Sequence, residues 1–313
     1  MKLIQNIQVN KIGAFTGHRD CVYAIERASL PHQFFSAAGD GLVVRWDMQH
    51  PDQGELIARI PASVYSLHYR AAEQQLWIGQ NFDGLHLIDL LSQREIGSVK
   101  LTDAAIFDIA SWQSNIYVAT GDGAVIILDQ ETMAVRKHIK ASDKSARCLA
   151  VNPQSGELAV GYSDHTIRIF DLETLQLKQV IAAHQNSVFT LTYSPDYHLL
   201  LSGSRDAHLK AWHTAGPYTL HTSVVAHMYA INHITYRPDG QYLVTGSMDK
   251  SIKVWDAATF RLLKVIDRAR HAGHGTSVNK LLWTDYHQHL ISASDDRSLS
   301  IWAVDIMQGE ISA

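Results

Sequence analysis

A short pattern repeats along almost the whole of this 313-residue chain, and it limits the possible folds more than any other feature. In each copy an Asp is followed by alternating apolar and polar residues and, six positions later, by an aromatic or apolar residue; a seventh copy, NFDGLHLID, is one residue shorter. These last residues lie 42, 40, 42, 42, 43 and 47 positions apart. Such a regular spacing is the signature of a repeat architecture. The residues are Trp46, Ile88, Leu128, Phe170, Trp212, Trp255 and Trp302.

The pattern within one period is that of β-strands. Residues alternate with period two and are rich in Val, Ile, Leu and Trp, and turn sequences such as SPDY at 194–197 and RPDG at 237–240 separate them. A helical repeat would instead place apolar residues at i, i+3 and i+4. Four short strands fit into each period, as in a propeller blade. The sequence therefore predicts an all-β fold, a seven-bladed β-propeller of four-stranded antiparallel blades, formed by residues 1–313 as a single domain.

The residues around the repeated Asp resemble those of the WD-repeat (WD40) β-propeller family, over about residues 9–304. In that family a regular blade carries a hydrogen-bonded tetrad: a His before the first strand, a Ser or Thr on the second, the turn Asp, and a Trp on the third. Four copies match, each with a His-to-Asp gap of 22, a Ser/Thr-to-Asp gap of 4 and an Asp-to-Trp gap of 6. They are His18, Ser36, Asp40, Trp46; His184, Ser202, Asp206, Trp212; His227, Thr245, Asp249, Trp255; and His274, Ser292, Asp296, Trp302.

The resemblance implies a structural role for these tetrads. An Asp in such a turn is costly to bury unless its oxygens accept hydrogen bonds. The His ring can donate to the Asp and accept from the hydroxyl group, and the Trp N–H supplies the remaining partner. Blades 2, 3 and 4 keep the turn aspartates Asp83, Asp122 and Asp164 but lack the His and the Trp. We expect these three blades to be more degenerate in geometry and locally less stable.

The last blade needs a strand from elsewhere in the chain. Its sequence runs out after Trp302, whereas VNKIGAF at 9–15 resembles the strand that precedes a loop His in other blades, such as LLKVI at 262–266. We therefore expect residues 9–15 to supply the outermost strand of blade 7. This closure removes two exposed sheet edges.

Composition and charge argue against several classes of function. The 27 basic and 31 acidic residues give a net charge of −4, so neither nucleic acid nor a membrane is expected as a partner. Cys21 and Cys148 are too few and too far apart for a secreted disulfide scaffold. The sequence shows no secretory leader and no run of about 18 apolar residues. The expected location is cytoplasmic.

Residue types that could support catalysis or metal binding are better explained by the fold. Of the 18 histidines, four belong to tetrads, and pairs such as His287 and His289 have no third ligand at useful spacing. The Ser, His and Asp trio recurs four times with a Trp, which a structural role explains and a single hydrolase site does not. The Gly-Asp-Gly turn at 121–123 lacks the Gly-Lys-Ser/Thr of a phosphate loop. We therefore predict no catalytic residue, no metal, no cofactor and no enzymatic activity.

One position in each blade indicates a binding surface. In WD-repeat proteins the first strand of each blade lines the central channel, and one residue between two apolar positions projects onto the top rim. Four of the seven residues at that position are aromatic, and a fifth is Arg147; exposed Tyr, Phe and Arg have the composition of an interface core. The residue before a turn Asp also faces the top. The predicted protein-binding residues of the top face are Tyr23, Tyr65, Phe82, Phe107, Arg147, Phe189, Arg205, Asn232, Met248 and Asn279.

The resemblance implies a non-catalytic protein-interaction scaffold or complex subunit that binds a protein or peptide on the top face. An alternative is a reader of an acidic or modified peptide that uses Arg147 and Arg205. A third reading is an enzyme with its site in the central channel. The aromatic residues could also simply plug the channel mouth. The expected partners are one or more proteins or peptides, and the expected form is a monomeric propeller.

Overall fold

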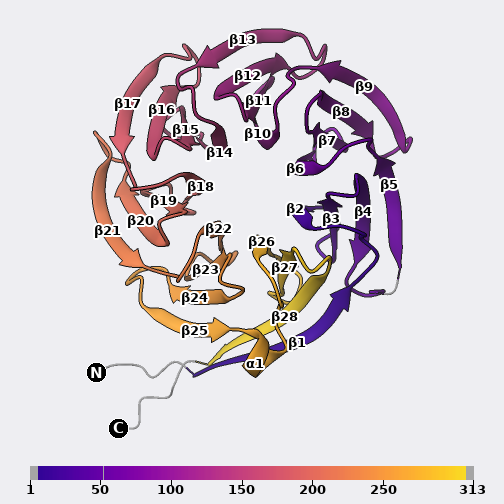
Figure 1. Cartoon of the computed structure of the whole chain (residues 1–313), viewed down its shortest axis with the longest axis vertical. Coiled ribbons are helices and arrows are strands. Elements are labelled where there is room, and N and C mark those ends of the chain that lie inside the picture. The colour runs from indigo at the N-terminus through magenta and orange to yellow at the C-terminus, as the bar shows by residue number, and fades with distance from the viewer. Residues whose placement is uncertain (1–5, 52, 308–313) are drawn as a thin grey trace.

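The computed structural model describes residues 6–51 and 53–307. They form seven four-stranded antiparallel sheets arranged as the blades of a closed ring (Figure 1), which confirms the predicted propeller. In each blade the innermost strand lies beside the central channel and the fourth lies at the outer wall.

Blades 1 to 4 follow one another along the chain, each with its strands in sequence order. Their strands are β2 (Val22–Arg27), β3 (Gln33–Ala38), β4 (Leu42–Asp47) and β5 (Gly54–Arg59); β6 (Val64–Arg70), β7 (Gln75–Gln80), β8 (Gly84–Asp89) and β9 (Arg94–Lys100); β10 (Ile106–Trp112), β11 (Asn115–Thr120), β12 (Ala124–Asp129) and β13 (Val135–Lys140); and β14 (Ala146–Asn152), β15 (Glu157–Tyr162), β16 (Thr166–Asp171) and β17 (Leu177–Ala182).

Blades 5 to 7 continue the ring, and the last one takes its outer strand from the other end of the chain. Their strands are β18 (Val188–Tyr193), β19 (Leu199–Ser204), β20 (His208–His213) and β21 (Thr219–Val225); β22 (Ile231–Tyr236), β23 (Tyr242–Ser247), β24 (Ile252–Asp256) and β25 (Leu262–Ile266); and β26 (Val278–Trp283), β27 (Leu290–Ser294), β28 (Leu299–Met307) and β1 (Asn6–Phe15).

The hydrophobic core lies between the blades. Each of seven apolar clusters joins residues of two neighbouring blades. In the cluster between blades 1 and 2, for example, Phe35 and Val43 share a core with Leu67 and Ile78. The second strands therefore read as nearly continuous apolar or small residues, because a neighbouring blade covers each of their faces.

Strand β1 closes the ring as predicted. It pairs antiparallel with β28 from Asn6 opposite Met307 to Phe15 opposite Leu299, and it begins three residues earlier than the sequence suggested. The ring of Phe15 is fully buried, with its centroid 5.2 Å from that of Phe34 and 5.1 Å from that of Trp46. Because Phe34 and Trp46 belong to blade 1, β1 joins blade 7 to blade 1 as well as completing blade 7.

Every innermost strand carries the same irregularity. In blade 1, Val22 pairs with Ala38 and Ala24 pairs with Ala37, so that Tyr23 is an extra residue opposite no partner. The same register shift falls at the corresponding residue in each of the other six blades. A β-bulge of this kind bends the strand and re-aims its side chains.

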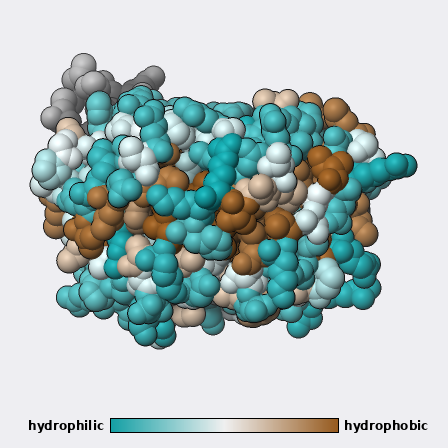
Figure 2. All heavy atoms as spheres, turned by 90° about the horizontal axis from the view of Figure 1, so that it is seen from above, coloured by the Kyte–Doolittle hydropathy of each residue, from teal (hydrophilic) through white to brown (hydrophobic). Residues whose placement is uncertain are grey.

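The outer wall carries few features besides its strands. The one helix among the described residues, α1 (Arg268–His271), precedes β26 beside β1, and Lys11 Nζ donates to the carbonyl oxygen of Ala272 at 3.2 Å. On the side of the ring that Figure 2 shows, apolar side chains gather in a band between polar surfaces. None of the described residues forms a helix long and apolar enough to cross a membrane.

Candidate functional site at the mouth of the channel

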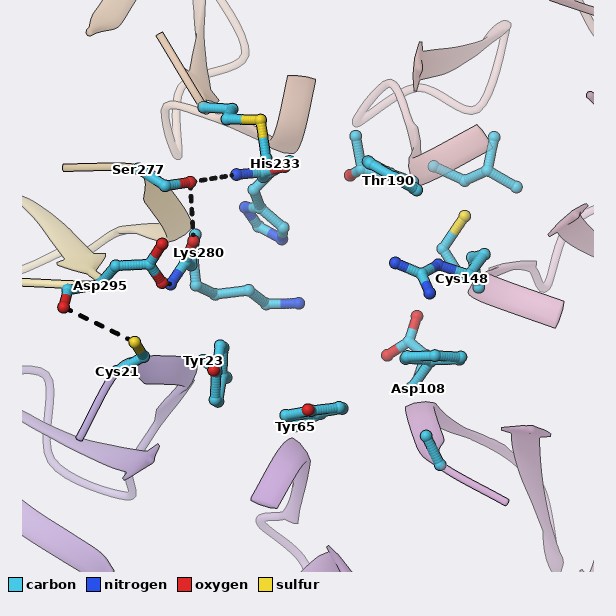
Figure 3. A pocket seen from close by; sticks show the side chains of 18 residues that line it. Cys21, Tyr23, Tyr65, Asp108, Cys148, Thr190, His233, Ser277, Lys280 and Asp295 are labelled. Carbon is cyan, nitrogen blue, oxygen red and sulfur yellow. Dashed lines mark hydrogen bonds between the residues drawn. The ribbon is translucent and has the colours of Figure 1, made fainter. Parts of the chain in front are cut away.

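A cavity of about 650 Å³ opens at the mouth of the central channel, on the side of the Asp-containing turns (Figure 3). All seven blades contribute to its lining. The lining includes eight of the ten residues that the sequence predicted for the top face: Tyr23, Tyr65, Phe107, Arg147, Phe189, Asn232, Met248 and Asn279.

The bulges explain why blades 3 to 7 each line this cavity with two consecutive residues of the inner strand. In a regular strand the residue after Phe107 would point to the opposite face. At a bulge two consecutive residues oppose one residue of the next strand, so both Phe107 and Asp108 reach the cavity. Lys280 follows Asn279 into the cavity in the same way. Simple alternation therefore missed Asp108 and Lys280, although a charge inside an apolar strand was a usable signal.

Aromatic side chains form one side of the cavity. The rings of Tyr23 and Tyr65 meet edge to face with centroids 4.6 Å apart, and the rings of Tyr65 and Phe107 are stacked with centroids 6.0 Å apart. Burial raises the pKa of the Tyr23 hydroxyl, so this residue stays a neutral hydrogen-bonding group at physiological pH. These three rings come from consecutive blades and present a continuous apolar and aromatic surface to the opening.

The guanidinium of Arg147 lies between two of the aromatic rings. Its central carbon is 3.9 Å from the ring centroid of Phe107 on blade 3 and 4.7 Å from that of Phe189 on blade 5. Cation–π contacts of this kind favour a fixed, planar orientation. Burial lowers the pKa of Arg147, but its ordinary value is so high that the group remains charged.

On the other side of the cavity, Asn232 and Asn279 hold neighbouring blades together. The side-chain amide of Asn232 donates to Ser277 Oγ and to the carbonyl oxygen of Val278, both at 2.9 Å. That of Asn279 donates to the carbonyl oxygen of Val22 at 3.0 Å and to Asp295 Oδ1 at 2.7 Å. Both amides are thus engaged in contacts between blades.

Titratable groups stand just inside the aromatic rim. Asp108 accepts hydrogen bonds from the backbone N–H groups of Ile109 at 3.0 Å and Leu149 at 2.8 Å, and burial raises its pKa. Burial also raises the pKa of the Cys148 thiol and lowers that of His233 well below its ordinary value, so both are neutral near pH 7.

Two predicted residues lie outside the cavity lining. Arg205 is exposed in the turn between β19 and β20. Phe82 is 63% exposed and does not precede an Asp at the usual place. In blade 1, Ala37 pairs with Val43, so Asp40 is at the centre of the turn between them. In blade 2, Gly79 pairs with Leu85, so Phe82 takes that central place. The apparent shortness of this repeat arises because Asp83 comes one residue late.

The four tetrads form the same hydrogen-bond network in blades 1, 5, 6 and 7. The Trp Nε1 donates to the Ser or Thr hydroxyl oxygen at 2.7–3.0 Å, and that hydroxyl lies 2.7–2.8 Å from the His Nε2. The His Nδ1 lies 2.9–3.3 Å from the turn carboxylate. Since the hydroxyl accepts from Trp and donates to Nε2, the proton of the neutral imidazole is on Nδ1 and is donated to the Asp.

The tetrads bury their reactive atoms. Ser36, Ser202 and Ser292 are fully buried, and each hydroxyl is held between His and Trp. Burial alone would raise the pKa of Asp206, but hydrogen bonds from His184 and the backbone of Gln185 outweigh it and leave that pKa well below its ordinary value. This arrangement stabilises turns and leaves no exposed nucleophile. Within residues 6–51 and 53–307, no three His, Cys, Asp or Glu side chains are grouped closely enough to hold a metal ion.

Comparison with known proteins agrees with this architecture. A model of the family described as "WD domain, G-beta repeat" matches residues 134–171, 175–213, 218–256 and 267–303. The crystal structure of the WD40 beta propeller domain of Doa1 is similar over 95% of this chain and 97% of that chain, with a TM-score of 0.83 at 15% sequence identity. Among curated proteins none matches the sequence.

The family matches do not coincide with the tetrads. They cover blade 4, which lacks the His and the Trp, and leave out blade 1, whose tetrad is complete. At 15% identity, the likeness to the Doa1 domain concerns the fold alone.

Proposed function

Because this chain belongs to the WD40-repeat family of β-propellers, we propose that it is a non-catalytic interaction platform that binds a protein or peptide at the mouth of its channel. The observation that carries the proposal is the cavity of about 650 Å³, with aromatic rings from consecutive blades along one side and a stacked arginine beside them. Clustered, accessible aromatic residues around a concavity are typical of binding surfaces.

The chemistry of the cavity supports binding rather than turnover. The Cys148 thiol is buried and its raised pKa keeps it protonated, which makes it a poor nucleophile. The Asp108 carboxylate already accepts two backbone N–H groups. We therefore propose that the channel has no catalytic residues and needs no cofactor.

The setting we propose follows from the same residues. The net charge of −4 gives no basis for a nucleic-acid partner. Cys21 and Cys148 are both free thiols, which fits a reducing compartment such as the cytoplasm. We propose that the chain acts there as a single-domain, monomeric propeller for a protein or peptide partner.

Affinity capture from native lysate tests the assignment. Beads carrying the wild-type chain, the variant Tyr65→Ala/Phe107→Ala, and the control Leu56→Ala/Leu91→Ala are compared by quantitative mass spectrometry. Leu56 and Leu91 are exposed on β5 and in the β8–β9 turn, outside the cavity. We expect the aromatic variant to lose specific partners and the control to keep them, with similar thermal midpoints for all three proteins. Identical partners on all three would show that the top-face assignment is wrong.

A further inference from the structure

The acidic groups of the cavity have hydrogen-bond partners, and its basic groups do not. Its two carboxylates accept hydrogen bonds, Asp108 from two backbone N–H groups and Asp295 from the amide of Asn279. Its two permanent cations, Arg147 and Lys280, form neither a hydrogen bond nor a salt bridge with any residue in 6–51 or 53–307. The cavity thus holds two cations without a bonded anion, and a ligand that complements them must supply acceptors.

The position of Arg147 determines how it can bind a ligand. Its guanidinium lies between Phe107 and Phe189, which leaves the N–H edge as the part that can meet a ligand. An edge of guanidinium N–H groups matches two oxygens of one anionic group in a bidentate contact. Because the two rings already hold the side chain, little conformational entropy is lost when it binds.

Lys280 supplies a second donor in the same space. Figure 3 shows its side chain extending from blade 7 into the open centre of the cavity, with no partner drawn at the ammonium. Asp108 and Glu26 act on it only as nearby charges, and burial raises the pKa of Glu26, on β2, to about 7. The ammonium and the Arg147 guanidinium therefore both line one accessible cavity as cations without a bonded anion.

We propose that the cavity binds a partner peptide through one carboxylate side chain, an Asp or a Glu, held between the edge of Arg147 and the ammonium of Lys280. This rests on the proposed function, because it names the chemistry of the partner at the same site. The aromatic arc of Tyr23, Tyr65 and Phe107 contacts the apolar part of the peptide beside that carboxylate.

The charges at the mouth favour a carboxylate over a phosphate group. Arg147, Lys280 and the exposed Arg205 bring three positive charges, and Asp108 and Asp295 bring two negative ones. Arg205 is near enough to Arg147 for the two charges to repel each other. One carboxylate balances the remaining positive charge, whereas a phosphoryl group of about two negative charges would leave an excess beside Asp108.

A displayed library of random eight-residue peptides tests the proposal. The library is selected on the full wild-type chain, and the best peptide is synthesised with its acidic residue intact, as the matching amide (Glu→Gln or Asp→Asn), and as phosphoserine. We expect every enriched sequence family to hold an acidic residue. The amide peptide should bind wild type about 10-fold more weakly, as loss of a charge-assisted hydrogen bond predicts.

The protein variants identify the partner of that carboxylate. In Arg147→Met and in Lys280→Met the difference in affinity between the acidic and amide peptides should be smaller than in wild type, because each variant removes one of the two cations that distinguish them. The controls Arg19→Met and Lys250→Met change exposed cations outside the lining and should keep the wild-type difference. If a variant fails to fold, the wild-type difference between acid and amide peptides still decides the proposal.

The outcomes separate this proposal from the proposed function. Peptides whose binding depends on Tyr65 and Phe107 but shows no preference for an acidic residue would contradict the carboxylate proposal. They would still support the proposed function as a binding platform. If the phosphoserine peptide binds more tightly than the acidic one, the carboxylate proposal is wrong and the cavity prefers a phosphate group. A wild-type chain that selects no peptide would count against both.

Discussion

Blades 1 and 2 have the same strand order and opposite chemistry at four matching positions. In blade 1 these positions hold the polar tetrad His18, Ser36, Asp40 and Trp46. The strand register puts Ile78, Phe82 and Ile88 at the same places in blade 2, and Ile60 precedes β6 by as many residues as His18 precedes β2. The three isoleucines are buried in one cluster, and Phe82 is exposed in the turn. Strand pairing and the apolar core therefore suffice to form a blade, and the tetrad is one of several ways to secure its turn.

Blade 4 stabilises the same turn in a third way. Asp164 keeps its turn position, but it accepts a hydrogen bond from Ser142 at 2.7 Å and forms a salt bridge with Arg168 at 2.9 Å. Ser142 stands 22 residues before Asp164, as His does in a tetrad. The expectation that blades 2, 3 and 4 are degenerate in geometry is wrong for strand pairing, since all three are complete four-stranded sheets with the common inner bulge. Their lower local stability stays a prediction.

Removing β1 should lower the stability most, because this strand completes blade 7 and packs against blade 1. Deletion of residues 1–15 removes the buried side chains Ile7, Val9 and Phe15. At about 1.5–3 kcal/mol each, their loss should lower the thermal midpoint by roughly 10–20 °C. Differential scanning calorimetry measures it. An unchanged midpoint would contradict closure by this strand.

The second test compares one turn position in two blades. Asp206→Ala leaves His184 and two backbone N–H groups without their acceptor, so the free energy of unfolding should fall by about 2–4 kcal/mol. Phe82→Ala, at the matching but exposed position of blade 2, should change it by less than about 0.5 kcal/mol. Urea denaturation gives both values. Equal losses would mean that the two turns depend on their central residue to the same extent.

The third test moves one tetrad residue into a blade that lacks it. Phe170→Trp buries an indole N–H in blade 4 where Val160 stands in place of the hydroxyl residue, at a cost of about 1–2 kcal/mol. Adding Val160→Ser supplies the acceptor and should recover most of that loss. A double-mutant cycle by denaturation measures the coupling. If the single variant is as stable as wild type, the pairing of Trp with a hydroxyl is dispensable.

The smallest expected effect is the contribution of one tetrad histidine to the pH dependence of stability. Burial lowers the pKa of His184, so the unfolded chain takes up its proton below about pH 6.5 while the folded protein resists it. Stability is therefore present above that pH and lost as the pH falls. Between pH 6.5 and 5.5, His184→Asn should lose up to about 1 kcal/mol less than wild type. Ile60→Val, at the matching position of blade 2, should retain the wild-type slope in the same denaturation series.

Much of this fold could be predicted from sequence because tetrad spacing and period-two alternation are local. The tetrad of His274, Ser292, Asp296 and Trp302 follows from spacing alone. The register of Phe82 does not, because it depends on which residues of β7 and β8 pair, and the nearby Asp83 imitates the usual turn. The stacking of Arg147 could not be predicted either, since it depends on the positions of three blades relative to one another.

The inner bulges have a consequence for how this protein could acquire new partners. A bulged residue is excluded from the hydrogen-bonded ladder, so its side chain can change without altering strand register. Substitution at a bulged position such as Phe107 can therefore change the cavity surface while the strands keep their pairing. The same frame could carry different specificities in related chains, limited by the side chains, such as Asn279, that also bond to a neighbouring blade.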